Sequence, residues 1–442
     1  MSYPIHGDHM PLTRPVNLEI WGGIECTVNR VNNEYQDQVR RSGHHNRVED
    51  MDCITSLGIK SIRYPVLWER VAPEHPEHLD WNWTDERLNR LRDAGINPIV
   101  GLIHHGCGPR YATFDGPAYA TELARYARRV AERYPWVTDY TPVNEPLTTA
   151  RFAGLYGHWY PHGQSDAHFV RLLLRQVQAT IRAMAQIRAV QPAARLIQTD
   201  DLSYVHSTSG VRYQADFENE RRFLTWDLLC GCVVPDHALW NYLLASGATE
   251  AELWAFVENP CPPSIIGANH YVTSERFLDE YTTGYPDWIP GTNGTHYYVD
   301  TEVVRASPEQ RLGVGKLLMQ VWERYGLPIA VTEAHLGDCV EEQKRWLGEV
   351  WRQAEEAKRA GADVRAVTVW ALFGLYDWHC LLTRQENRYE PGAFNVSSGR
   401  AIPTELVEMI VQLGNGRPVE ELMPPGEGWW QMKQEACHPM LV

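Results

Sequence analysis

Two glutamates stand at the ends of short β-prone runs, where a carboxylate is poorly placed to build a core. Glu145 ends the run that begins at Asp139, and Pro146 follows it directly. Glu333 ends a second buried-type run, which begins at Leu327. A carboxylate at the C-terminal tip of a barrel strand points into the cleft. We therefore predict that Glu145 and Glu333 face each other across a barrel mouth and act on a glycosidic bond.

Two carboxyl groups suit this chemistry because the leaving oxygen needs a proton and the transition state resembles an oxocarbenium ion. One group must stay protonated while the other stays ionised, so their surroundings must differ. We expect Arg63 to favour ionised Glu333 by its charge, and Tyr271 to donate a hydrogen bond to it. Glu145 stands beside Asn144 and apolar residues, which favours its protonated form. The Asn144 amide can bind a sugar 2-hydroxyl.

The rest of the chain alternates short apolar runs with longer amphipathic stretches. We expect eight buried strands, at 17–23, 59–68, 96–105, 139–145, 195–200, 264–271, 327–333 and 366–372. Buried strands separated by helices pair in parallel, and eight such units close into a (β/α)8 barrel. A doubly wound open sheet is the alternative, but no glycine-rich phosphate loop follows the first strand.

Helices are expected in the intervening stretches, and Gly58 and Gly95 stand where a helix-ending glycine is typical. The expected ranges are about 47–57, 88–94, 117–134, 166–190, 218–229, 240–257, 308–325, 340–360 and 403–413. Three long connections, at about 147–165, 272–306 and 374–401, each follow a strand and so lie on the catalytic face. We expect one barrel domain, 1–414, and a C-terminal tail, 415–442, that packs on the barrel or trails from it.

Composition narrows the classes of partner. The 442 residues carry a net charge of -15, which disfavours nucleic acid and anionic membranes. Tyr and Trp (21 and 17) outnumber Phe (9), which suits a wet cleft that stacks on sugar rings and equally a Trp-rich core. The nine cysteines are scattered, and neither a metal-ligand spacing nor a signal peptide is visible. We expect a cytoplasmic enzyme without metal or organic cofactor, acting on a small saccharide or glycoside; its oligomeric state is left open.

The motifs resemble those of family 1 glycoside hydrolases of the β-glucosidase type. The segments that carry the resemblance keep the family's order: 63–73, 105–109, 141–146, 154–163, 269–271, 331–333 and 370–378. The resemblance implies a retaining enzyme on a (β/α)8 barrel, with Glu145 as acid/base and Glu333 as nucleophile. It further implies supporting or substrate-binding roles for a set of eight residues: Arg63, His105, Asn144, Asn269, Tyr271, Trp370, Asp377 and Trp378.

The chain also departs from the family pattern around the expected sugar pocket. Ala334 and His335 replace the usual Asn-Gly after the nucleophile, and Gly106 replaces a Trp. The first-strand Gln that binds the glycone is absent, with Glu25 or Asn29 nearby, and Asp377 stands in place of Glu. We therefore expect the chain to retain the chemistry of the two carboxyl groups. Its glycone pocket should be β-glucoside-like but altered.

Other functions fit parts of this pattern. A glycosyl-transferring enzyme would use the same two glutamates. A saccharide-binding barrel without turnover would explain the altered pocket and the Trp429-Trp430 tail, but it has no need of two buried carboxylates, which cost stability. A metal-dependent hydrolase would use some of the 18 histidines, but no His-x-His strand pattern is present.

Overall fold

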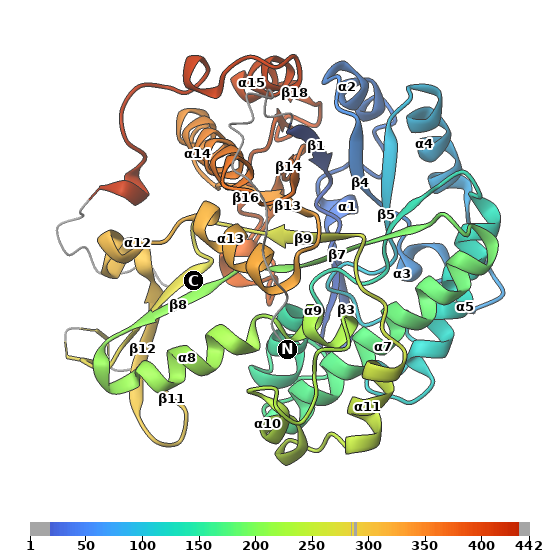
Figure 1. The fold of residues 1–442 in the computed structure, drawn as a ribbon. Coiled ribbons are helices and arrows are strands. Elements are labelled where there is room, and N and C mark those ends of the chain that lie inside the picture. Colours follow the sequence, from blue (N-terminus) through green and yellow to red (C-terminus); the bar gives the residue numbers. More distant parts are fainter. Residues whose placement is uncertain (1–17, 284, 287–289, 433–442) are drawn as a thin grey trace, which may run out of the picture.

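The computed structural model describes residues 18–283, 285–286 and 290–432. Eight strands of this described part run parallel and close into a barrel, as predicted (Figure 1). In barrel order they are β1 (Glu19–Gly23), β4 (Ser61–Pro65), β5 (Asn97–Gly101), β6 (Asp139–Thr141), β7 (Arg195–Asp201), β9 (Ile265–Asn269), β13 (Ile329–Ala334) and β14 (Val364–Val369). Pairing of β14 with β1 closes the ring.

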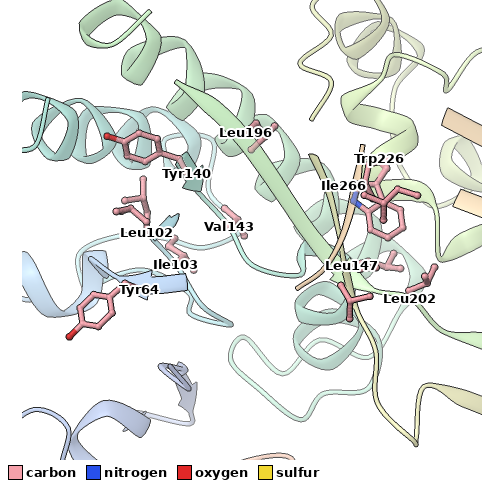
Figure 2. Close-up of a cluster of buried hydrophobic side chains, with 14 of the residues drawn as sticks. Tyr64, Leu102, Ile103, Tyr140, Val143, Leu147, Leu196, Leu202, Trp226 and Ile266 are labelled. Atoms are coloured by element: carbon pink, nitrogen blue, oxygen red, sulfur yellow. The ribbon is translucent and has the colours of Figure 1, made fainter. Parts of the chain in front are cut away.

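The barrel strands are buried on both faces, which explains their near-continuous apolar sequences. One small cluster draws a side chain from each of six strands: Trp21, Ile99, Ile197, Ile265, Ala330 and Ala366. A much larger cluster joins strands to the surrounding helices. Figure 2 shows part of it, where Tyr140, Leu196 and Ile266 of three strands lie among side chains from the segments after β5 and β6.

Helices surround the strands (Figure 1). The longer ones are α2 (Asp50–Ser56), α4 (Asn82–Asp93), α5 (Tyr119–Arg133), α7 (Asp166–Val190), α8 (Arg212–Arg221), α9 (Leu224–Leu229), α10 (Trp240–Ala245), α11 (Glu250–Glu258), α13 (Val314–Tyr325), α14 (Val340–Arg359) and α15 (Glu405–Gly414). Short ones are α1 (Gln38–Arg41), α3 (Trp68–Val71), α6 (Pro146–Ala150), α12 (Val303–Ala306) and the π-turn η1 (Arg151–Leu155). No helix in the described ranges is long and apolar enough to cross a membrane.

Local signals placed several helix ends correctly and missed others. Gly58 and Gly95 adopt φ of +67° and +69° just after α2 and α4, which confirms their helix-ending role. The single helix expected over 240–257 is wrong: Gly247, at φ +94°, separates α10 from α11. The helix expected over 308–325 begins only at Val314, because Gly313 adopts φ +78° before it. The stretch 218–229 likewise holds parts of two helices, α8 and α9.

The long connections carry structure of their own. The β1–β4 connection holds the hairpin β2 (Val28–Val31) and β3 (Glu34–Asp37). A four-stranded sheet combines β8 (Tyr204–Ser207) with β10 (Glu275–Asp279), β11 (Gly291–Thr292) and β12 (Tyr297–Glu302). The connection after β14 contains two two-stranded ladders: β15 (Leu375–Tyr376) with β16 (Tyr389–Glu390), and β17 (Phe394–Asn395) with β18 (Ile402–Pro403).

The described part of the C-terminal tail packs on the barrel. Trp430 is buried at 1% exposure, and its ring stands edge-on to Trp346 of α14 at 5.4 Å. Its Nε1 donates to Glu349 Oε2 over 2.8 Å. Trp430 is therefore a core residue, so it no longer supports a saccharide-binding role for the tail.

Candidate active site

Glu145 lies in a strained turn between β6 and α6. The strand ends at Thr141, earlier than predicted, because Pro142 has no N–H for the ladder. Glu145 adopts the left-handed conformation (φ 46°, ψ 65°), which costs a non-glycine residue about 1–3 kcal/mol. Its N–H donates to Thr199 O over 3.2 Å, and Pro146 begins α6 directly after it. Strain of this kind is typical of functional sites.

The Glu145 carboxyl is almost fully buried, at 4% exposure. Asn269 Nδ2 donates to its Oε1 over 2.6 Å, and His105 Nε2 lies 3.9 Å from its Oε2. Burial, followed by the negative charges of Glu333 and Asp201, raises the pKa of Glu145 well above its usual range, and the Asn269 hydrogen bond only partly opposes this. Glu145 is therefore set to hold a proton.

Glu333, near the end of β13, is equally buried but differently partnered. Arg63 Nη1 contacts its Oε1 at 2.5 Å, and the Tyr271 hydroxyl donates to its Oε2. Burial raises the pKa of Glu333 as well, but the Arg63 charge and the hydrogen bonds from Arg63 and Tyr271 act in the opposite direction. When the pair carries one proton, these partners favour it on Glu145 and favour Glu333 as the anion.

Asn144 contacts residues that lie beside each of the two carboxyl groups. Its Oδ1 accepts from Arg63 Nη2 at 2.6 Å and from Thr199 Oγ1 at 2.7 Å. Its Nδ2 lies 3.2 Å from His104 Nε2 and 3.3 Å from His105 Nε2. Burial, with the nearby Arg63 charge, lowers the pKa of His105 to about 3, so the ring is neutral and can bind hydroxyl groups.

Trp370 follows β14 and packs against the same network. His104 stacks on its ring at 5.3 Å and 8°, and the Arg63 guanidinium lies 4.8 Å from the ring centroid. The indole N–H donates to Glu25 Oε2 over 3.3 Å. Burial raises the pKa of Glu25, and the Glu333 charge raises it further, so Glu25 is a third carboxyl electrostatically coupled to the site.

Asp377 makes contacts of another kind. Its carboxylate accepts from Arg41 Nη2 at 2.6 Å and from three backbone N–H groups of its own loop, at residues 386–388. These hydrogen bonds outweigh the effect of burial and lower the pKa of Asp377. Because four donors occupy both oxygens, Asp377 holds its loop closed, and the predicted contact with a sugar has no support in this geometry.

Trp378 lies beside His105, on the Glu145 side of the site. Its ring centroid is 5.5 Å from that of His105 and 6.3 Å from that of Trp159. Its Nε1 is buried and has no hydrogen-bond partner among the described residues, and the same holds for Asn29 Oδ1. Two hydrogen bonds hold the loop that follows Trp378. Leu382 O accepts from Asn29 Nδ2 at 3.4 Å, and Leu381 O accepts from Trp159 Nε1 at 2.7 Å.

The structure thus links most predicted site residues into one network and leaves Asp377 in a separate one. Sequence reasoning left four further contributors out of its set of site residues: His104, Thr199, Glu25 and Arg41. His104 and Glu25 stand at strand tips, so strand-end position was a usable signal for both. The roles of Thr199 and Arg41 depend on partners far away in sequence, and no local pattern marks them.

Replacing Arg63 tests the electrostatic design of the site. In Arg63→Met, Glu333 loses its cation, so its pKa rises further and the anion forms only at higher pH. We expect kcat/KM to fall roughly 100-fold or more, with the acid limb of its pH profile moved upward. Circular dichroism and thermal unfolding check that the fold persists. An unchanged acid limb would show that Arg63 does not control ionisation of Glu333.

Within the described residues, no three His, Cys, Asp or Glu side chains gather as a metal site would require.

Comparisons with known proteins identify relatives of this chain. The sequence model of glycosyl hydrolase family 1 matches residues 17–231. Beta-glucosidase A of Thermotoga maritima is 23% identical over 418 residues, covering 85% of this chain and 87% of its own. Thermostable beta-glucosidase B of Thermobispora bispora is 25% identical over 393 residues, with 81% and 78% covered.

Solved structures show the same fold. A family 1 β-glucosidase from Thermotoga maritima superposes with a TM-score of 0.72 at 17% identity, covering 92% of this chain and all of that chain (100%). The Thermotoga maritima enzyme in complex with deoxynojirimycin gives a TM-score of 0.71 at 19% identity, with 90% and 98% covered.

Proposed function

The chain belongs to glycosyl hydrolase family 1, and from this premise we propose that it is a retaining β-glycosidase. Glu333 is the nucleophile and Glu145 the acid/base of a double displacement. The observation that carries the proposal is the contrast between two buried carboxyl groups. Glu333 has a guanidinium and a phenol as partners, whereas Glu145 has one amide and neighbouring negative charges.

In the first step, ionised Glu333 attacks the anomeric carbon while Glu145 gives its proton to the glycosidic oxygen. The bond to the aglycone breaks, the aglycone leaves as an alcohol, and a glycosyl ester forms on Glu333. In the second step, Glu145 takes a proton from water, and the water oxygen attacks the same carbon. The ester bond breaks, free sugar leaves, and both carboxyl groups return to their starting states.

The surrounding side chains fit a sugar with several hydroxyl groups. Neutral His104 and His105 offer ring nitrogens, and Asn144 offers an amide to the hydroxyl beside the anomeric carbon. The unpartnered Asn29 Oδ1 can accept a hydrogen bond from a sugar hydroxyl group, and the unpartnered Trp378 Nε1 can donate one. The glycone is β-glucoside-like, bound without help from the Asp377 carboxylate.

The Asp377 carboxylate already accepts hydrogen bonds from Arg41 and from its own loop, and this observation favours a second candidate function. A site that holds its sugar by fewer contacts could transfer the glycosyl group to another acceptor, or bind saccharide without turnover. The strained Glu145 backbone and the paired buried carboxyl groups favour catalysis.

Trapping with 2-deoxy-2-fluoro β-glycosides tests the proposal. The fluorine slows hydrolysis of the ester more than its formation, so a stable adduct should accumulate on Glu333. A panel that differs only in the glycone, read by intact mass and peptide mapping, identifies the nucleophile and the preferred sugar together. Adding a sugar acceptor to the adduct distinguishes transfer from hydrolysis by the product. An adduct on any other residue would contradict the assignment, and no adduct from a folded protein would favour saccharide binding.

A further inference from the structure

The loop after β5 makes a tight turn, 104–109, that brings a histidine to the acid/base. Within it His105 adopts φ +54° and Gly108 adopts φ +81°. His105 Nδ1 lies 3.0 Å from Thr149 Oγ1, and His105 Nε2 lies 3.9 Å from Glu145 Oε2. A left-handed histidine is held only where its surroundings over-determine it.

The carboxyl group of Glu69 lies directly under this turn. Glu69 belongs to α3 and is 8% exposed. Its Oε1 accepts from Gly108 N over 2.9 Å. A Cβ atom on Gly106 would overlap the same oxygen, so the carboxyl fills the space that any side chain at 106 would need. This accounts for the glycine at a position where the family resemblance leads one to expect Trp.

No charge of opposite sign compensates Glu69 among the described residues. Its Oε2 is buried without a hydrogen-bond partner, and it takes part in no ion pair. Burial raises the pKa of Glu69 to about 7; hydrogen bonds from the backbone N–H groups of Glu69 and Gly108 partly oppose this, and the charge of Asp37 reinforces it. The titratable groups coupled to it are Asp37, Tyr35, Cys107, Tyr111, Tyr119 and Tyr126. The thiol and the phenols have raised pKa values and stay neutral, and Asp37 is paired with Arg70.

We propose that Glu69 is a positioning residue: its carboxyl group supports the 104–109 turn and so holds His105 beside Glu145. Ionisation of this buried carboxyl group would weaken that support. This inference rests on the proposed function of Glu145. Protonated Glu69 is neutral and compatible with burial, whereas the ionised form is a buried charge that no cation offsets. Glu69 acts on the reaction only through His105, without touching the substrate.

The sign of the effect on stability follows from linkage. The folded-state pKa of Glu69 lies above its unfolded value, so between about pH 4.5 and 7 the folded protein binds more protons than the unfolded chain. Its contribution to stability is therefore fully present below about pH 4.5 and is lost as pH rises to about 7. Glu69→Gln keeps the shape and can still accept from Gly108, but it has no proton to lose.

The first test compares melting temperatures from pH 5 to 8 for the wild type, Glu69→Gln and Glu74→Gln, in which an exposed glutamate serves as control. As pH rises to 7.5, we expect the melting temperature of Glu69→Gln to increase by several degrees relative to that of the wild type. The control should follow the wild type. Parallel curves for all three proteins would overturn the proposal, whether or not the protein is a glycosidase.

The second test measures kcat/KM against pH with a 2,4-dinitrophenyl glycoside, whose leaving group needs no proton from Glu145. For the wild type we expect a several-fold fall centred near pH 7, and for Glu69→Gln a flat profile over the same interval. If the pH profile of kcat/KM for Glu69→Gln superposed on that of the wild type, Glu69 would have no role in positioning the site. This would hold even if the substitution changed the melting temperature.

The third test uses the packing of Gly106. Gly106→Ala should reduce kcat/KM at least tenfold, because the new methyl group displaces the Glu69 carboxyl. In the double variant Glu69→Ala/Gly106→Ala the new methyl group no longer meets the carboxyl group, so kcat/KM should fall no further than it does in Glu69→Ala alone. Additive losses would show that the two positions act independently and would contradict the proposed support of the turn.

Discussion

Glu333→Gln should lower kcat/KM by roughly 10⁴-fold or more, because the amide cannot form the glycosyl ester. The amide oxygen can still accept from Arg63 or Tyr271, so the variant should fold normally. The loss should be equal for good and poor leaving groups, since both need the nucleophile. Initial rates on a series of aryl glycosides measure it, and Glu341→Gln, on the exposed start of α14, serves as control.

A smaller replacement gives this prediction a positive readout. Glu333→Ala leaves room for azide on the face of the sugar where Glu333 attacks. Azide should restore turnover of an activated glycoside and release a glycosyl azide of inverted configuration. An azide product of retained configuration would place the nucleophile elsewhere.

Glu145→Ala should separate substrates by their leaving groups. For alkyl or phenyl glycosides, which need protonation, we expect a loss of roughly 10²–10⁴-fold in kcat/KM. For 2,4-dinitrophenyl glycosides the same parameter should change little. Their kcat should fall, because hydrolysis of the ester on Glu333 loses its general base. Equal losses in kcat/KM on both classes would contradict the acid/base role.

The pH profile offers a second check on Glu145. As an acid it works only while protonated, and burial with the Glu333 and Asp201 charges raises its pKa. Activity on phenyl glycosides should therefore persist well above the ordinary titration range of a glutamate before it falls. In Glu145→Ala this alkaline limb should vanish. A wild-type limb at the ordinary carboxyl range would mean that the buried geometry does not persist in the working enzyme.

Much of the barrel was predictable because its signals are local. The strands are mostly apolar runs, several of them followed by polar residues, and Gly58 and Gly95 end their helices by conformational preference alone. The positions of Glu145 shortly after β6 and of Glu333 near the end of β13 follow from the same pattern, since parallel strands bring their carboxyl ends to one face. Helix breaks such as the one at Gly247 were missed, because a glycine inside an apolar pattern predicts a helix end only weakly.

What the sequence alone determined is the set of strands and the two carboxyl groups that they bring to one face. The tertiary structure decided which partner each polar side chain has. Asp377 is held by Arg41, 336 residues away, and Trp430 is buried against α14. Glu69 fills the space that a side chain at position 106 would occupy. The physical reason is that strand and helix signals lie within a few residues, whereas hydrogen bonds and burial join side chains from distant segments. Their effect on pKa and orientation exists only after the chain has closed.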